Sequence, residues 1–244
     1  MIEALLPNIN NSLYKDANPR YLNNNVAVPR VTEILSAMLH EDFLMEWANR
    51  IGLYKRQKYK ETLEKAARIG TYSHDLVEQY IRNQIYNIDV MGISSRIEYD
   101  SAKNAVESFR LWYNDVFTLN NTINILGIEE RLTCRWFGGT YDMLIEINGR
   151  IYLVDFKTSN HISYKYCLQI SAYMYMLKLD RDIHIDGAII LQLDKKTPCY
   201  TEYILDFSNE IHKSFIEDCE ECFLSLVYSY YQRLNIESQY KIIF

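Results

Sequence analysis

The spacing of hydrophobic residues divides the chain into two parts with different periods. Between residues 31 and 117 they recur every three or four positions, which is the period of amphipathic helices. A break is expected at Gly70-Thr71, with Ser73 close enough to help cap the helix that follows. A further helix is predicted from about Glu98 to Phe117.

Beyond residue 120 the pattern becomes that of strands, and one turn signal stands out. Asn148-Gly149 lies between two apolar runs, which strongly favours a hairpin because a type I′ turn needs positive φ at both central positions. The predicted elements are strands Ile123 to Cys134, Trp136 to Ile147 and Arg150 to Phe156, a helix Tyr164 to Lys178, strands His184 to Leu193 and Cys199 to Asp206, and a helix Asn209 to Leu234.

This order of elements predicts an α/β fold. Helices, three strands, a helix, two strands and a helix favour a mixed central sheet flanked by helices over a bundle or a sandwich. A chain of 244 residues is long enough for a substantial core. We expect a single domain over residues 1–244, with a mainly helical part at 1–120 and a core at 121–244.

The predicted hairpin brings two carboxylates together. With a two-residue turn, residue 147 faces residue 150, and counting onward places Asp142 opposite Asp155. Opposed residues share a sheet face with Cβ atoms about 4.5–5.5 Å apart, where two carboxylates repel each other. A divalent cation between them removes this penalty, and Mg²⁺ takes one or two carboxylates together with phosphate oxygens and water.

Lys157 adds a cation to the same place. It lies two residues beyond Asp155, so strand alternation puts both side chains on one face. Beside a bound metal, its ammonium group can stabilise charge on a phosphate under attack, or orient or help deprotonate the attacking water. An exposed cross-strand ion pair is the alternative. The apolar run IYLVDF argues against it, because an unpaired charge in such a strand is costly.

The string GGTYDMLIEINGRIYLVDFKTS, followed by QISAYMYM, resembles the PD-(D/E)XK nucleases, and within them the RecB-type exonuclease branch of phage and mitochondrial genome-maintenance exonucleases. That branch shows Gly-x-x-Asp, Asp-x-Lys and Gln-x-x-x-Tyr in this order. The matching positions are Gly139 and Asp142, Asp155 and Lys157, and Gln169 and Tyr173. Upstream, Gly70-x-x-x-His74 resembles the helical histidine of the branch, and VPRVTEILS resembles the N-terminal segment of its phage members. The similarity covers roughly residues 28 to 180.

The resemblance implies a restriction-endonuclease-like core and a role for each matching residue. The implied ligands of Mg²⁺ or Mn²⁺ are His74, Asp142, Asp155 and the backbone carbonyl of Phe156. Gln169 and Tyr173, which share a helix face, are implied to position the lysine, the water or the DNA backbone. A structural histidine at position 74 and a half-buried amphipathic stripe at 169 and 173 are the alternatives.

Some features stay open or depart from the branch. Glu78, one turn beyond His74, is either a support for the metal site or a solvated residue. Glu130, on the strand that leads to the site, is either a metal ligand or exposed. Tyr141 stands where a proline gives the superfamily its name, although the branch commonly lacks that proline. Some relatives hold an iron–sulfur cluster through an early cysteine, and since no cysteine precedes Cys134 we expect no cluster.

Charge and cysteines change this picture little. A net charge of -6 argues against a surface that attracts DNA everywhere, but not against a local basic groove. Lys55 to Arg68, with six basic and two acidic side chains, is the candidate groove, or else a solvated helix face. The five cysteines are expected to be reduced, and Cys219 and Cys222 to be buried helix residues.

The expected function is that of a metal-dependent DNA exonuclease of low sequence specificity in replication, recombination or repair. Single-stranded or end-containing duplex DNA is the expected substrate, and replication or recombination proteins are candidate partners. Without a secretory pattern or an apolar run of about 18 residues, we expect a cytoplasmic protein of a bacterial or phage-infected cell, with no membrane partner. The alternatives are a structure-specific or restriction-like endonuclease, and an inactive DNA-binding or assembly module of the same fold.

Overall fold

The computed structural model describes residues 6, 9–16, 19–39, 59–118 and 122–243. Its helices are η3 (Asn11–Leu13), α1 (Val31–Met38), α3 (Tyr59–Asn83), η4 (Ile88–Met91), α4 (Arg96–Thr118), α5 (Tyr164–Arg181) and α6 (Glu210–Ile243). Its strands are β1 (Leu22–Asn23), β2 (Val26–Ala27), β3 (Ile123–Thr133), β4 (Gly138–Ile147), β5 (Arg150–Lys157), β6 (Gly187–Leu193) and β7 (Tyr200–Asp206). The predicted order of the core elements is confirmed, and α6 ends at Ile243 rather than at Leu234.

A mixed five-stranded sheet forms the centre of the molecule, in the order β3-β4-β5-β6-β7. Neighbouring strands are antiparallel except for β5 and β6, which are parallel and joined through α5. A parallel pair needs such a crossover because a tight turn can only join antiparallel strands. The predicted α/β fold with a helical N-terminal part is therefore confirmed.

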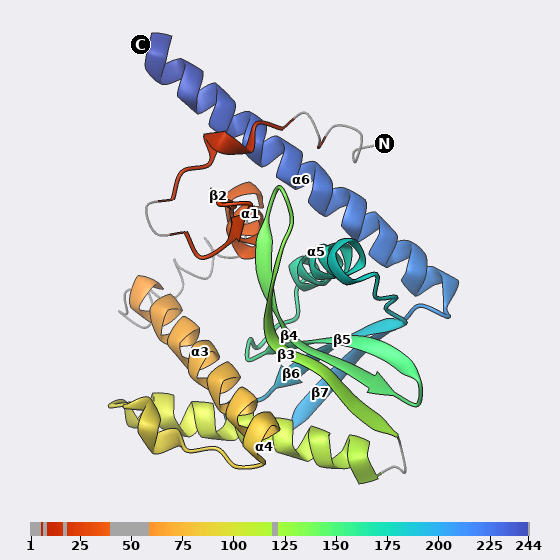
Figure 1. Cartoon of the computed structure of the whole chain (residues 1–244). Coiled ribbons are helices and arrows are strands. Elements are labelled where there is room, and N and C mark those ends of the chain that lie inside the picture. The colour runs from red at the N-terminus through yellow and green to blue at the C-terminus, as the bar shows by residue number, and fades with distance from the viewer. Residues whose placement is uncertain (1–5, 7–8, 17–18, 40–58, 119–121, 244) are drawn as a thin grey trace.

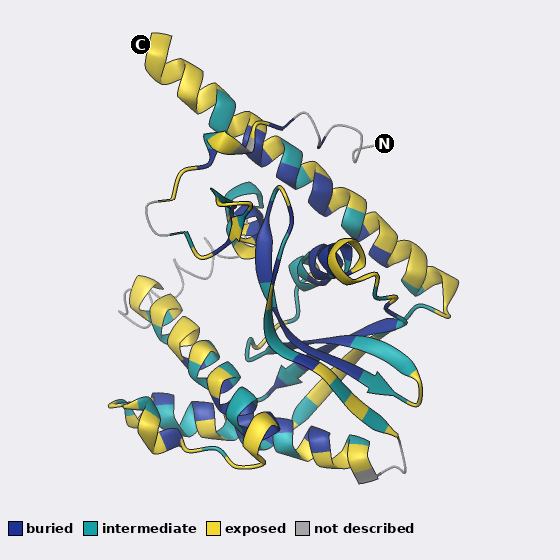
Figure 2. Cartoon of the chain, viewed as in Figure 1, coloured by how far each residue is buried: buried dark blue, intermediate teal, exposed yellow. Residues whose placement is uncertain are grey.

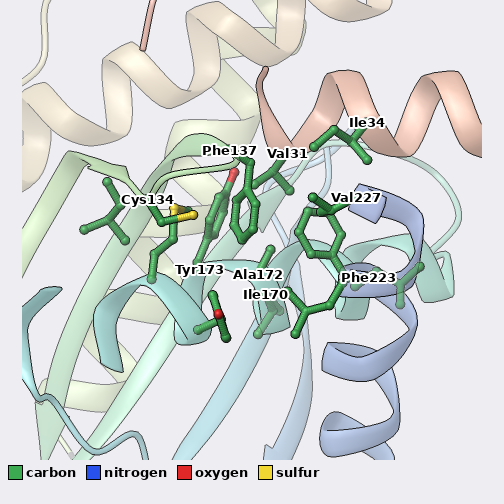
Figure 3. Close-up of a cluster of buried hydrophobic side chains, with 14 of the residues drawn as sticks. Val31, Ile34, Cys134, Phe137, Ile170, Ala172, Tyr173, Phe223 and Val227 are labelled. Carbon is green, nitrogen blue, oxygen red and sulfur yellow. The ribbon is translucent and has the colours of Figure 1, made fainter. Parts of the chain in front are cut away.

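The sheet separates two hydrophobic cores (Figures 1 and 2). One lies against α1, α5 and α6, where the rings of Phe137 and Phe223 are 5.0 Å apart (Figure 3). The other lies against α3 and α4, where the rings of Phe109 and Phe156 are 5.3 Å apart. Since Phe156 points toward α4, strand alternation directs its two neighbours toward α5.

The hairpin signal is confirmed in detail. Asn148 and Gly149 have φ values of 53° and 78°, as a type I′ turn requires. The β4–β5 ladder pairs Ile147 with Arg150 and continues in the predicted register as far as Met143 and Val154.

The break predicted at Gly70-Thr71 is wrong, because α3 runs without interruption from Tyr59 to Asn83. Ser73 caps no helix. Its buried hydroxyl donates a hydrogen bond to the carbonyl of Ile69 at 2.7 Å, as serines within helices do. Burial of one face of α3 against α4 and the sheet outweighs the weak helix propensity of a single glycine.

Three further expectations concern regions away from the sheet. Of the stretch Lys55 to Arg68, residues 55–58 lie outside the described residues, and the remainder is mostly solvent-exposed on α3. All five cysteines are free. Cys219 is buried as predicted, whereas Cys222 is exposed. No helix within the described ranges is long and apolar enough to cross a membrane.

Candidate active site

Two acidic residues stand where the strand ladder is interrupted. The β3–β4 ladder keeps one register from Gly127 to Thr133, but within it Glu129 and Asp142 form no ladder pair. Glu129 has a φ of 48°, a left-handed conformation that costs an L-residue about 1–2 kcal/mol. Strain of this kind is often found at functional sites.

Both strands change face at this point. Ile128 packs toward α3 and α4, whereas Glu130, two residues on, accepts a hydrogen bond from Arg181 of α5. In the same way Tyr141 belongs to the core under α5 and Met143 to the core under α4. Regular alternation would keep residues two apart on one face. The switch frees the intervening Glu129 and Asp142 to turn toward α3.

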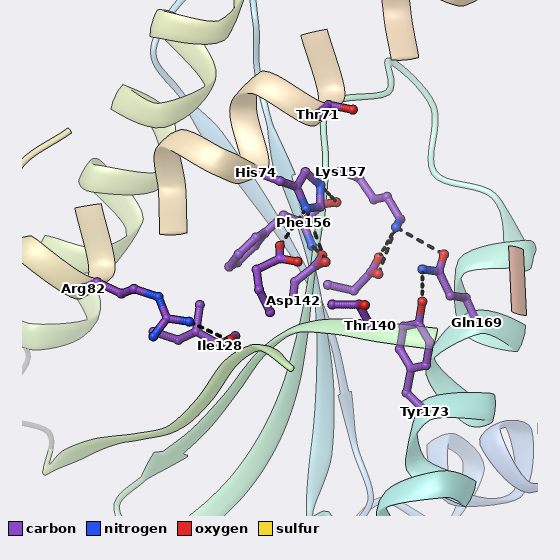
Figure 4. A network of polar contacts seen from close by, with 12 residues as sticks. Thr71, His74, Arg82, Ile128, Thr140, Asp142, Phe156, Lys157, Gln169 and Tyr173 are labelled. Carbon is purple, nitrogen blue, oxygen red and sulfur yellow. Dashed lines mark hydrogen bonds and ion pairs between the residues drawn. The ribbon is translucent and has the colours of Figure 1, made fainter. Parts of the chain in front are cut away.

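His74 of α3 meets these two carboxylates, and Figure 4 shows it beside Asp142. Its Nδ1 lies 3.3 Å from Oδ1 of Asp142 and 3.4 Å from Oε1 of Glu129. Its Nε2 lies 3.2 Å from the backbone carbonyl oxygen of Phe156, whose N–H donates a hydrogen bond to Oδ2 of Asp142 at 2.6 Å. One potential ligand atom from each of the three side chains lies within 4.8 Å of the other two.

A second group adjoins this cluster on the α5 side of the sheet. Nζ of Lys157 lies 2.9 Å from Oδ1 and 2.7 Å from Oδ2 of Asp155. It also donates a hydrogen bond to Oε1 of Gln169 at 3.3 Å, and Nε2 of Gln169 donates one to the hydroxyl of Tyr173 at 2.9 Å (Figure 4). The Tyr166 ring centroid lies 4.7 Å from the same Nζ. The ammonium group is therefore held in one position from several directions.

One of the two motif glycines is required for this arrangement. A Cβ at Gly139 would lie 2.4 Å from Cε1 of Tyr173, so only glycine lets β4 approach α5 closely. A Cβ at Gly70 would lie 3.8 Å from Oγ1 of Thr158, which is an ordinary contact.

The carboxylates strongly favour the charged form of His74. Burial opposes the imidazolium, but the charges and hydrogen bonds of Asp142 and Glu129 outweigh burial and raise the pKa of His74 to about 10. Burial also acts to raise the pKa of Asp142, yet His74, Lys157 and the Phe156 N–H lower it overall. Without a metal ion, a protonated imidazole thus supplies the positive charge that these carboxylates need.

Asp155 and Lys157 form one ion pair, but their raised pKa values favour the neutral form of the aspartate and the charged form of the lysine. Burial, assisted by the charge of Asp142, raises the pKa of Asp155 to about 6 in spite of the adjacent ammonium group. Burial disfavours the charged form of Lys157, but Asp155 and Asp142 together raise its pKa above the ordinary value. The carboxylates of Asp142, Asp155 and Glu129 face only two cationic side chains here, which leaves an excess of negative charge around Asp155.

The donor set fits a divalent cation. Oδ2 of Asp155 is buried and accepts no hydrogen bond from the residues that the structure describes, although it lies 2.7 Å from Nζ of Lys157. Lys157 therefore already supplies one counter-charge, yet the three carboxylates of Asp155, Asp142 and Glu129 share only this ammonium group and His74. Carboxylate oxygens and one imidazole nitrogen are suitable donors for Mg²⁺ or Mn²⁺.

Comparison with known proteins is decisive at the level of the family. The sequence model of the PD-(D/E)XK nuclease superfamily matches residues 46–223, well over half of the 244 residues. The chain belongs to the PD-(D/E)XK nuclease superfamily. Nucleases of this superfamily generally use divalent metal ions.

Other comparisons add little to the superfamily assignment. A solved structure titled "Crystal structure of SSO0001" is 12% identical, with a TM-score of 0.26, and the similarity covers 65% of this chain and 74% of that one. A likeness this weak carries no argument about function. No curated protein matches the chain.

The structure gathers the residues predicted from the sequence, with one correction to their geometry. Asp142 does not pair with Asp155 in the ladder, which ends one pair earlier, at Met143 and Val154. Because β4 changes face at Asp142, its carboxylate binds His74 and the Phe156 N–H, whereas Asp155 binds Lys157. The two carboxylates remain electrostatic neighbours across the strand pair.

Glu129 was missed by the sequence reasoning, which singled out the adjacent Glu130. Regular alternation from Ile128 would direct Glu130 toward α3, and only the face switch reverses this. Glu130 instead accepts hydrogen bonds from Arg181 at 2.5 Å and from the Tyr141 hydroxyl at 2.9 Å. The strain at Glu129 is visible only in the folded backbone, so the sequence held no signal for it.

Glu78 also lies outside the three-residue cluster. It accepts a hydrogen bond from Arg82 at 2.8 Å, and Arg82 donates another to the carbonyl of Ile128 at 3.2 Å (Figure 4). Glu78 therefore helps to hold β3 immediately before Glu129.

Proposed function

We propose that this protein is a divalent-metal-dependent deoxyribonuclease of the RecB-type branch that degrades DNA from its ends with low sequence specificity. One observation carries the proposal: the histidine and carboxylate cluster of His74, Glu129 and Asp142 adjoins an ion pair between the buried Asp155 and the half-buried Lys157. Ionisable groups whose pKa values are shifted by burial and by specific charged partners cluster at functional sites. Superfamily membership supplies the reaction class, phosphodiester hydrolysis.

The residues that would hold Mg²⁺ or Mn²⁺ are His74, Glu129, Asp142, Asp155 and the backbone carbonyl of Phe156. A divalent ion supplies Lewis acidity toward a phosphate oxygen and lowers the pKa of bound water. The imidazole would bind through a neutral nitrogen, so that it gives up the proton that the carboxylates otherwise favour.

Lys157 is the group that we assign to the reacting phosphate. Its ammonium group, half-buried and oriented by Asp155, can stabilise the charge that develops on a phosphate oxygen during in-line attack. Gln169 and Tyr173 act as positioning residues, because their hydrogen bonds reach the lysine from α5. Such a site contacts the DNA backbone, and backbone contacts carry no direct sequence information.

Digestion from ends is supported by the motif set as a whole. The matches at Gly139 and Asp142, Asp155 and Lys157, and Gln169 and Tyr173 are those of an exonuclease branch, and their side chains form adjoining networks. Replication or recombination proteins are the partners that we propose for such an activity.

The activity test uses end-labelled DNA with Mg²⁺, Mn²⁺ or EDTA. Wild type should release labelled nucleotides with either metal and none with EDTA, whereas Asp155→Ala and Lys157→Ala should each lose at least about 10²-fold in rate, as loss of a catalytic group does. Wild type that is inert toward every DNA and RNA substrate would favour an inactive binding module.

Substrate topology separates the two nuclease alternatives. An exonuclease should degrade linear DNA and leave covalently closed circles intact. Digestion of closed circles at a comparable rate would instead indicate an endonuclease with the same chemistry.

A further inference from the structure

A polar cavity of about 330 Å³ lies at the carboxyl ends of the parallel strands β5 and β6. One wall is the segment Thr158–Asn160, which directly follows Lys157. The other wall is the β6–β7 turn with Asp194, Lys195 and Lys196. We call this cavity the twin-lysine groove.

The twin-lysine groove shares a wall with the candidate active site. Lys157 pairs with Gln192 in the β5–β6 ladder, and Nε2 of Gln192 donates a hydrogen bond to the carbonyl of Ser159 at 2.7 Å. The Tyr166 hydroxyl donates to Oγ of Ser159 at 3.0 Å, while the ring of the same tyrosine faces Nζ of Lys157. The segment Thr158–Asn160 is thus held between the candidate active site and the twin-lysine groove.

The turn that carries the lysines is held in place by α4. Nδ2 of Asn104 donates hydrogen bonds to the carbonyls of Lys195 and Lys196, at 3.3 Å and 2.8 Å. Oγ of the buried Ser108 lies 3.0 Å from the carbonyl of Asp194, and Oδ1 of Asp194 accepts from the Lys196 N–H at 2.6 Å. A preorganised turn loses little entropy when it binds a ligand.

Of the two lysines on this turn, Lys195 is half-buried and Lys196 is exposed. Within the described ranges, neither ammonium group forms a salt bridge or a side-chain hydrogen bond. Burial, with a small effect of Lys196, lowers the pKa of Lys195 although Asp194 opposes this. The Asp194 carboxylate is itself engaged by backbone N–H groups. A bound anion would relieve the repulsion between the two adjacent positive charges.

We propose that the twin-lysine groove binds the phosphodiester backbone of the strand being cut, on one side of the scissile phosphate. The inference rests on the proposed nuclease function. From Lys157 to Asn160 the chain spans at most about 11 Å, and one DNA strand rises about 3.4 Å per nucleotide. The groove therefore lies within about three nucleotides of the reaction. Lys195 and Lys196 supply the charge, and the hydroxyl of Thr158 and the amide of Asn160 supply hydrogen-bond donors.

The test measures DNA binding without cleavage. Fluorescence anisotropy of a labelled oligonucleotide is recorded in EDTA over a series of salt concentrations for wild type and for Lys195→Gln/Lys196→Gln. Loss of two phosphate contacts should lower the slope of log K against log salt by about 1.4 for single-stranded DNA, or about 1.8 for duplex. The matched control, Lys178→Gln/Lys213→Gln, removes the same charge from the cavity between α5 and α6 and should leave the slope unchanged.

The outcomes separate this proposal from the nuclease proposal. A slope that falls equally in both double variants would reflect net charge alone and overturn the groove, as would an unchanged slope in Lys195→Gln/Lys196→Gln. If wild type cleaves DNA but the slope of Lys195→Gln/Lys196→Gln is unchanged, the groove proposal is wrong and the nuclease proposal stands. If DNA binding shows the predicted slopes but wild type cleaves no DNA, the groove proposal stands and the nuclease proposal is wrong. Equal thermal unfolding temperatures of the variants show that folding is intact.

Discussion

At the scale of single residues, the site depends on which of two adjacent glutamates reaches His74. Glu129 lies 3.4 Å from the imidazole, whereas Glu130 is bound to Arg181 and Tyr141. The side chains are chemically identical and differ only in direction. Replacing Glu129 and Glu130 one at a time therefore distinguishes the effect of losing a metal ligand from that of losing a structural ion pair.

We predict that Glu129→Gln raises the Mn²⁺ concentration for half-maximal cleavage by at least about tenfold, as loss of groups at metal sites does. Glu130→Gln should leave the metal requirement unchanged and lower the free energy of unfolding by no more than about 1 kcal/mol, since its ion pair is partly exposed. Metal titrations of the cleavage rate test both. Equal metal requirements in the two variants would contradict the assignment of Glu129.

The motif glycines allow a second comparison between single residues. Gly139→Ala places a Cβ within 2.4 Å of the Tyr173 ring and should lower the free energy of unfolding by about 1–3 kcal/mol, as overpacking does. Gly70→Ala meets only an ordinary contact within a helix and should raise that free energy by about 0.5–1 kcal/mol. Urea unfolding of both variants measures the difference. A Gly139→Ala protein as stable as wild type would show that β4 and α5 can separate at no cost.

At the scale of elements, the β4–β5 hairpin sets the relative position of the two aspartates. Its turn needs positive φ at Asn148 and Gly149. α3 contributes His74 from the other side because it continues through Gly70 without a break. The site therefore forms where a locally determined hairpin meets a helix held by tertiary burial.

Gly149→Ala should lower the free energy of unfolding by about 1–2 kcal/mol, because alanine is strained at a φ of 78°. Gly149→Asn should cost less, since asparagine tolerates the left-handed region. Chemical denaturation of the two variants tests this order. The same loss in both would mean that the turn changes type and relieves the strain.

At the scale of the whole molecule, the charge balance of the site couples folding to pH and to metal. In the folded, metal-free protein the pKa of His74 is raised to about 10 by its carboxylate partners, against 6.5 for a free histidine. The resulting stability is fully present below pH 6.5 and is lost as the pH rises toward 10. The pKa of Asp155, raised to about 6, likewise makes the folded protein less stable as the pH rises from 3.8 to 6.

We predict that in EDTA the unfolding temperature falls as the pH rises above 6.5, and that His74→Asn removes much of this fall. Saturating Mn²⁺ should raise the unfolding temperature and flatten its pH dependence, because a metal-bound imidazole is neutral at every pH in this window. Thermal unfolding at fixed pH values measures both effects, with the exposed His161→Asn as control. A pH dependence identical in His74→Asn and wild type would contradict this charge balance.

The sequence by itself determined those features that depend on near neighbours along the chain. The Asn148-Gly149 turn, the strand register that follows from it and the common face of Asp155 and Lys157 all depend on local backbone geometry. The order of helices and strands, and with it the α/β class, follows from hydrophobic period. These predictions are confirmed because the relevant forces act within a few residues.

The tertiary structure decided where distant elements meet. The continuity of α3, the switch of face at Glu129 and Asp142, and the choice of Glu129 over Glu130 all arise from packing of the helices on the two sheet faces. Burial and ion pairing between remote segments outweigh the local preferences for a helix break at Gly70 and for regular alternation along β3. Such long-range terms leave no trace in the spacing of residues along one chain.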